Sequence, residues 1–404
     1  MRRIIPVFTL LSLACGPATS LPVQEVRPGV DVLAAGPPAV LAGKRIGLIT
    51  NQTGVGRDGR STIDILAAAP GMELVALFSP EHGIRGVAAE GERITSGRDE
   101  RTGLPIHSLY GETRKPTAEM LRGIQALVFD IQDVGARPYT YVSTMALGMQ
   151  AAKEAGIPFV VLDRPNPIGG TVVEGGVLDP AFATFVGMYP IPARHGMTVG
   201  ELARLFNAEF GIGADLTVVP VRGWRRDAWF DRTGLPWVNP SPNIRSLTAA
   251  AHYPGTVFFE GTNLSEGRGT DRPFEQTGAP WLRAAEVADS MNALRLPGVR
   301  FEAVEIAVDS AAAKHPRQRL PGVRLVLTDR ETYRPVESAL LLIDLIRRLH
   351  PQHFEWRVSH FDRLAGTDRL RQALERGTLP ALLRAWEDEA RAFDARRRPY
   401  LLYP

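Results

Sequence analysis

Apolar runs alternate with helix-like segments in the first half of the chain. Continuous apolar runs, each followed by turn-forming Asn, Asp, Pro or Gly, occupy positions 44–50, 72–79, 126–131 and 158–163. Helical periodicity and helix-forming residues lie between them, at positions 61–69, 117–124 and 143–156. This alternation is typical of a mostly parallel sheet that helices cover on both faces. We therefore predict a Rossmann-like, doubly wound α/β domain over residues 40–250.

The second half of the chain has a different pattern, which predicts a smaller α+β domain over residues 251–404. Its predicted helices are 282–294, 335–350 and 379–397, and its predicted strands are 300–308 and 323–329. The connection at 239–281 is rich in Pro, Gly and Asn, and we expect little regular structure there. Long connections are usually functional or disordered, and the aromatic residues of this one argue against disorder. We predict that residues 255–281 form an active-site loop.

The first residues read as an export signal. Arg2 and Arg3 precede a short apolar run, and small residues follow it, so residues 1–20 are predicted to direct the chain to the periplasm or beyond the cell. Cys15, the only cysteine, lies at the end of the run. Two processing routes are consistent with this pattern. One is lipid modification of Cys15, which would anchor the protein to a membrane, and the other is ordinary cleavage after Ser20. Either way the mature domain has no disulfide.

Composition and motifs exclude several classes of protein. The 47 Lys and Arg residues nearly balance the 44 Asp and Glu residues and are scattered, which indicates no nucleic-acid surface. No Gly-x-Gly-x-x-Gly motif follows the first strand, and a P-loop and a Gly-x-Ser-x-Gly elbow are also missing. His82 and His195 lack metal-binding spacing, so neither a metal nor any other cofactor is expected.

Polar side chains follow each of the four predicted strands of the first domain. They are Asn51 after the first, Glu81 and His82 after the second, Asp130, Asp133 and Arg137 after the third, and Asp163 and Asn166 after the fourth. Capping or turn formation explains any one of them. Ligands of open α/β sheets bind outside the carboxyl ends of the strands, however, so the joint pattern predicts a binding site at this edge.

Carboxylates provide the most plausible chemistry at this edge. A Glu81 partly shielded from water would favour its protonated form and suit the protonation of a glycosidic oxygen. Asp130, Asp133, Asp163 and Glu266 are candidates to stabilise positive charge or activate water. Arg137, Arg268 and Arg272 are candidates to bind an anionic substrate group, and internal salt bridges to Asp133 and Asp271 are the alternative.

Several longer motifs occur together in this chain. They are LITNQTG, LFSPEHGIRG, DIQDVGARPYTY, LDRPNPIGG, RHGMTVGELA, NPSPNI and FFEGTNLSEGRGTDRPFEQTGAPW. Together they resemble the NamZ-type exo-β-N-acetylmuramidase family, from about Gly43 to the C-terminus. The resemblance implies a Rossmann-like domain, a smaller C-terminal domain and an active-site cleft between them. It also implies an exo-acting hydrolase that removes N-acetylmuramic acid from peptidoglycan fragments.

The resemblance also assigns roles to residues. It implies that Glu81 is the catalytic residue and that Glu266 is a second glutamate facing the cleft. Tyr139 and Asn263 lie within the same motifs and are predicted substrate contacts. The lactyl carboxylate of muramic acid would give the candidate arginines a defined ligand.

Other functions and mechanisms stay open at this point. A non-catalytic periplasmic receptor for muropeptides fits two lobes and a polar cleft equally well. A metal-dependent hydrolase is the weaker enzymatic alternative. Within the preferred function, three mechanisms are possible. A second carboxylate acts either as a nucleophile or as a base that activates water. Alternatively, the acetamido group of the substrate attacks, and Asp130 or Asp133 orients it.

Overall fold

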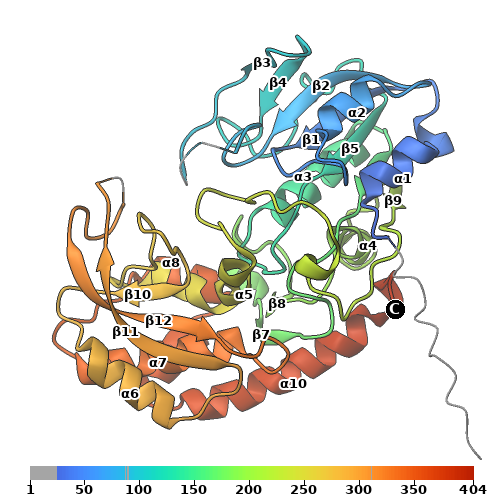
Figure 1. The fold of residues 1–404 in the computed structure, drawn as a ribbon. Coiled ribbons are helices and arrows are strands. Elements are labelled where there is room, and N and C mark those ends of the chain that lie inside the picture. Colours follow the sequence, from blue (N-terminus) through green and yellow to red (C-terminus); the bar gives the residue numbers. More distant parts are fainter. Residues whose placement is uncertain (1–24, 87, 89–90, 311) are drawn as a thin grey trace, which may run out of the picture.

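The computed structural model describes residues 25–86, 88, 91–310 and 312–404 (Figure 1). The predicted export signal and Cys15 lie outside these residues. No helix within them has both the length and the apolar character that crossing a membrane requires.

A seven-stranded sheet organises the first domain, which confirms the predicted mostly parallel α/β fold. Its strand order is β3-β4-β2-β1-β5-β6-β9, and all neighbours are parallel except β3 and β4. The strands are β1 (Arg45–Thr50), β2 (Glu73–Ser79), β3 (Gly97–Arg98), β4 (Pro105–Ser108), β5 (Ala126–Asp130), β6 (Phe159–Leu162) and β9 (Leu216–Val219). The chain adds β2 to one side of β1 and β5 to the other. Ligands bind beyond such a switch point in doubly wound sheets.

Helices cover both faces of this sheet, which explains why its strands are apolar throughout. Leu48 and Val128 pack in a core with α1 (Gly29–Ala35) and α2 (Thr62–Ala67). Ile49 and Phe129 point to the opposite face, under α3 (Tyr141–Glu154) and α4 (Val199–Glu209). Each such buried side chain contributes about 1.5–3 kcal/mol to folding.

The second domain combines a three-stranded antiparallel sheet with helices. Strands β10 (Gln276–Gly278), β12 (Arg319–Leu327) and β11 (Val299–Ala307) lie in that order. The helices are α5 (Leu247–Thr256), α6 (Ala284–Ala293), α7 (Pro335–Leu349), α8 (Val358–Ala365), α9 (Arg369–Arg376) and α10 (Leu379–Arg397).

Short 3₁₀ helices occur along the whole described chain, and they are η1 (Ala39–Leu41), η2 (Pro180–Phe182), η3 (Phe230–Arg232), η4 (Val257–Gly261) and η5 (Arg398–Tyr400).

The two domains are tied together by the chain's C-terminal part. Helix α10 packs against the hairpin of β7 (Glu174–Val177) and β8 (Pro192–Arg194), then leads the chain back to the first domain (Figure 1). There the Tyr403 hydroxyl donates to Asp163 and accepts from the Val221 amide. A continuous apolar core also joins the domains.

Two predictions about local structure are wrong. The helix predicted at 117–124 is a series of turns, where Gly123 has a φ of 79°. So short a segment is not stable as a helix without strong packing. The connection at 239–281 is more regular than expected, because it contains α5, η4 and β10. Gly255 lets α5 approach α7 closely, since a Cβ there would lie 2.0 Å from the Pro335 carbonyl oxygen.

The buried carboxyl group of Glu174 gives a prediction for stability. Its Oε1 accepts from the Glu337 amide at 2.9 Å, whereas Oε2 is buried without a hydrogen bond. Burial raises the pKa of Glu174 to about 7. The folded state therefore keeps a proton that the unfolded state loses above its ordinary pKa, so this group's contribution to stability falls as pH rises towards 7.

Glu174→Gln removes this titration and keeps the Oε1 acceptor. We expect the free energy of unfolding of the variant, minus that of wild type, to be about 2 kcal/mol larger at pH 8 than at pH 4.5, because only wild type loses stability as the pH rises. Urea unfolding at both pH values measures it. A difference between variant and wild type that does not change with pH would contradict the buried, proton-binding carboxyl group.

Candidate active site

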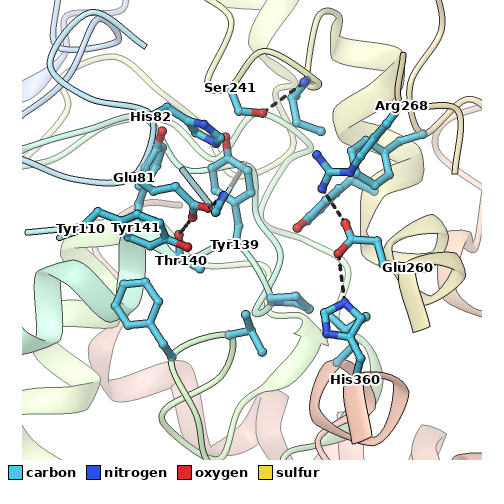
Figure 2. A pocket seen from close by; sticks show the side chains of 18 of the residues that line it. Glu81, His82, Tyr110, Tyr139, Thr140, Tyr141, Ser241, Glu260, Arg268 and His360 are labelled. Carbon is cyan, nitrogen blue, oxygen red and sulfur yellow. Dashed lines mark hydrogen bonds and ion pairs between the residues drawn. The ribbon is translucent and has the colours of Figure 1, made fainter. Parts of the chain in front are cut away.

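A cavity of about 210 Å³ opens where the carboxyl ends of the sheet meet the second domain. Residues of both domains line it (Figure 2): Glu81, His82, Gly91, Tyr110, Arg114, Pro138, Tyr139, Thr140, Tyr141, Phe185, Val186, Ser241, Ile244, Tyr253, Glu260, Arg268, Phe274, His360 and Leu364. Four of the predicted site residues are among them, namely Glu81, His82, Tyr139 and Arg268. Glu260 and Phe274 come from the predicted active-site loop at 255–281, whereas Tyr110, Arg114, Phe185 and His360 come from segments whose role the sequence did not indicate.

Glu81 lies on one wall of the cavity, directly after β2. Only 8% of the residue is exposed. The Thr140 hydroxyl donates to Glu81 Oε2 at 2.7 Å, and the Gly91 amide approaches Oε1 at 3.4 Å. Both of these donors are uncharged.

The turn that holds Glu81 has unusual backbone geometry. His82 has a φ of 69°, a conformation that costs free energy for a residue with a side chain. Its Nδ1 lies 2.8 Å from the Ala88 carbonyl oxygen, which fixes the ring against the turn. Burial lowers the pKa of His82, so the ring is neutral at pH 7. His82 therefore supports the turn beside Glu81 and adds no positive charge to the cavity.

Glu260 lies on the opposite wall and is the second carboxylate of the cavity (Figure 2). Arg268 Nη2 donates to its Oε1 at 2.7 Å, and His360 Nε2 lies 3.5 Å from its Oε2. Burial acts to raise the pKa of Glu260, but the charge of Arg268 and the hydrogen bond from His360 outweigh it, so the pKa is lowered. Glu260 thus remains ionised at neutral pH.

Four aromatic rings of the cavity lining pack against one another. Tyr139 meets Tyr141 and Tyr253 edge to face, with ring centroids 5.0 and 5.6 Å apart. Tyr253 meets Phe274 in the same way at 4.8 Å. Edge-to-face pairs of this kind are favourable arrangements of aromatic rings and stabilise this part of the lining.

The structure corrects the prediction that Glu266 faces the cleft. Glu266 is 5% exposed and is not among the residues that line the cavity. Its Oε2 pairs with Lys314 Nζ at 2.8 Å, and its Oε1 lies 3.3 Å from Arg268 Nε. Glu266 therefore supports Arg268 from behind, and Glu260 takes the place that the sequence assigned to Glu266.

The buried pair of Glu266 and Lys314 predicts an effect on stability rather than on chemistry. Lys314 also donates to the Phe259 and Leu264 carbonyl oxygens, and burial lowers its pKa. We expect Glu266→Gln to lower the free energy of unfolding by about 2–4 kcal/mol, because it leaves a buried ammonium group unpaired. Thermal unfolding measures this, with the exposed Glu305→Gln as control. An unchanged melting temperature would contradict the structural role.

Several polar residues at the strand ends stabilise the fold instead of lining the cavity. The carboxylate of Asp130 pairs with Arg164, and that of Asp163 accepts from the Gly200 amide at 2.7 Å near the start of α4. Asn51 Oδ1 accepts from the Thr53 amide at 2.9 Å. Asn166 Nδ2 donates to the Met197 carbonyl oxygen at 3.0 Å, and its Oδ1 accepts from Ile168. For these four residues, capping and turn formation explain the sequence pattern.

Asp133 and Arg137 also lie outside the cavity lining. Asp133 Oδ2 accepts from the Gly135 amide at 2.6 Å and lies 3.5 Å from His195 Nε2. Arg137, only 1% exposed, donates to the carbonyl oxygens of Leu364 and Ala365 at the end of α8. Burial lowers the pKa of Arg137 to about 10. Its guanidinium joins the two domains and is not available to a substrate anion.

The remaining predicted residues belong to the loop of the second domain. Arg272 is half exposed and pairs with Glu275 at 3.3 Å, away from the cavity lining. Asn263 donates to the His353 carbonyl oxygen at 2.7 Å and accepts from the Glu355 amide. Among the residues that the structure describes, no group of three or more His, Cys, Asp or Glu side chains is arranged to hold a metal ion.

The fold and the cavity together define a two-domain α/β protein with two glutamates on opposite walls of an interdomain site. The family described as exo-beta-N-acetylmuramidase NamZ matches the chain twice, its N-terminal part at residues 46–248 and its C-terminal part at 251–403. The chain belongs to this family, which confirms the resemblance seen in the motifs.

Individual relatives agree with this assignment. The chain is 49% identical over 381 residues to the peptidoglycan beta-N-acetylmuramidase NamZ of Bacillus subtilis (strain 168), covering 94% of this chain and 92% of that protein. Two crystal structures of DUF1343 family proteins from Bacteroides fragilis NCTC 9343 share the fold. Their TM-scores are 0.88 and 0.73, at 37% and 33% identity, and each covers 94% of this chain and 99% of its own.

Proposed function

We propose that this chain is an exo-acting glycoside hydrolase that removes β-linked N-acetylmuramic acid from the non-reducing ends of peptidoglycan fragments. The observation that carries the proposal is the pair Glu81 and Glu260, which face each other across one interdomain cavity (Figure 2). The 49% identity to the Bacillus subtilis enzyme supports the same substrate. A cavity of about 210 Å³ suits one terminal sugar better than an extended glycan.

The surroundings of the two glutamates assign different roles to them. Glu81 receives hydrogen bonds from uncharged donors, whereas Glu260 is held as an anion by Arg268. Environments that separate two carboxyl groups in this way divide the acid from the charge-stabilising group. Glu81 is thus the proton donor, and Glu260 stabilises positive charge.

The reaction follows from these roles. Glu81 transfers its proton to the glycosidic oxygen as the bond between that oxygen and C1 breaks, and the remaining glycan leaves as an alcohol. Positive charge develops at C1 and the ring oxygen, where the anion of Glu260 lowers its free energy. Water then adds to C1 in place of the leaving group, and the proton that it loses restores the acid.

The proposed location follows the same chemistry. Residues 1–20 have the pattern of an export signal, and the substrate of the proposed reaction is part of the cell wall. The protein therefore acts in the periplasm or outside the cell, and lipid attachment at Cys15 would hold it at a membrane. Mass spectrometry of the mature N-terminus distinguishes the lipid-modified from the cleaved form.

Turnover tests the proposed function. The purified chain is incubated with a β-1,4-linked disaccharide of N-acetylmuramic acid and N-acetylglucosamine, with and without a chelator. We expect many equivalents of free monosaccharide per protein in both reactions. Stoichiometric binding without monosaccharide release would identify a receptor, and loss of activity with the chelator would identify a metal-dependent hydrolase.

A further inference from the structure

Arg114 is an arginine of the cavity lining that the sequence did not single out. Its guanidinium lies over the Phe185 ring at 4.2 Å and over the Tyr110 ring at 5.3 Å from the ring centroids. Within the described residues it forms no ion pair. The aromatic contacts therefore hold a positive charge at the cavity without neutralising it.

The other arginines near this site are already engaged by carboxylates or carbonyl groups. Arg268 lies between Glu260 and Glu266, at 2.7 and 3.3 Å. Arg137 donates to carbonyl oxygens of α8, and Arg272 pairs with Glu275 outside the cavity. Arg114 therefore differs from Arg268, the other arginine of the lining, because no described carboxylate pairs with it.

Tyr110 places this charge relative to the reacting groups. Its ring, which Arg114 overlies, lines the same cavity as Glu81 (Figure 2). A sugar whose glycosidic oxygen meets Glu81 would therefore occupy the same cavity that the Arg114 side chain lines. A guanidinium binds a carboxylate through two parallel N–H bonds, which fixes orientation as well as charge.

We infer that Arg114 binds the lactyl carboxylate of the terminal muramic acid and selects it over N-acetylglucosamine, which differs by lacking that group. This inference rests on the proposed function. It replaces Arg137 and Arg272, which the structure removes from consideration, with a residue that lines the cavity. Arg114 is then a determinant of specificity, whereas Glu81 and Glu260 act on the bond that breaks.

The test pairs changes in the enzyme with changes in the substrate. Wild type, Arg114→Gln and Arg114→Lys are assayed on an aryl β-N-acetylmuramide and on its lactyl methyl ester. We expect Arg114→Gln to lower kcat/KM on the free acid by roughly 10- to 100-fold, and to change it little on the ester. Arg114→Lys restores part of the activity on the acid, because it keeps the charge but not the planar fork.

Arg319→Gln is the matched control, because Arg319 is an exposed arginine of β12 paired with Glu305. It should leave both activities unchanged. If Arg114→Gln lowered kcat/KM equally on the free acid and on the methyl ester, the inference would be overturned while the proposed function remained intact. Failure of the wild type to hydrolyse either compound would instead overturn the proposed function, and the role of Arg114 with it.

Discussion

Glu81→Gln is expected to lower kcat on the natural disaccharide by about 10³-fold or more. Glutamine fits the same space and can accept from Thr140, but it has no proton to give to the leaving sugar. On an aryl glycoside with an acidic leaving group, the loss should be about tenfold, because departure of a phenolate needs little protonation. Steady-state kinetics on both substrates measures the contrast.

Glu112→Gln is the control for this substitution, because the Glu112 side chain is 90% exposed and lies outside the cavity lining. It should leave both rates unchanged. If Glu81→Gln lowered kcat by the same factor on the disaccharide and on the aryl glycoside, Glu81 would have a role other than protonation of the leaving group. Full activity on the disaccharide would remove Glu81 from the reaction altogether.

Glu260→Gln is expected to have the second-largest effect, a loss of about 10²- to 10³-fold in kcat. The substitution removes the anion that faces the developing positive charge and leaves Arg268 only partly compensated by Glu266. Because this charge develops whatever the leaving group, the disaccharide and the aryl glycoside should lose activity by similar factors. This pattern is the opposite of the one expected for Glu81→Gln.

Glu266→Gln gives the comparison within the same loop. At a temperature where it remains folded, it should keep most of its kcat, because Glu266 contacts Lys314 and the back of Arg268. A larger loss of kcat for Glu266→Gln than for Glu260→Gln would contradict the assignment of the second carboxylate. Circular dichroism at the assay temperature establishes that each variant is folded.

The sequence predicted the parts of the fold that depend on local patterns. Strands β1, β2, β5 and β6 are buried on both faces, so their apolar runs were visible, and α10 was predicted with the bounds that the structure shows. Strands β3, β4 and β9 were missed. They are short and partly exposed, so they lack a continuous apolar signal.

The candidate site was predicted on one wall and only in part on the other, where the loop at 255–281 and Arg268 were predicted but Glu260 and His360 were not. Glu81 follows a strong strand at the edge of the sheet where ligands bind, so its position was apparent from local sequence. Glu260 follows an apolar segment that reads as core, and His360 comes from α8, far along the chain. Only tertiary packing brings these two side chains to the cavity.

Polar residues at strand ends were the main source of wrong site predictions. Three of these residues follow strands at the edge where ligands bind, but their side-chain oxygens have partners within the fold. Asp130 pairs with Arg164, Asp163 accepts from an amide at the start of α4, and Asn166 accepts from the amide of Ile168. Sequence alone cannot distinguish a carboxylate that stabilises a turn from one that faces a cavity. The hydrogen-bonding partners of the carboxylate distinguish the two cases, and these partners come from other segments of the chain.

The most direct test of the account is a crystal structure of Glu81→Gln with the intact disaccharide. We predict that the terminal muramic acid occupies the interdomain cavity, with the glycosidic oxygen about 2.6–3.2 Å from the side chain at position 81 and the carboxylate of Glu260 on the opposite side of the sugar. A sugar bound outside this cavity, or a glycosidic oxygen next to Glu260 and away from position 81, would contradict it.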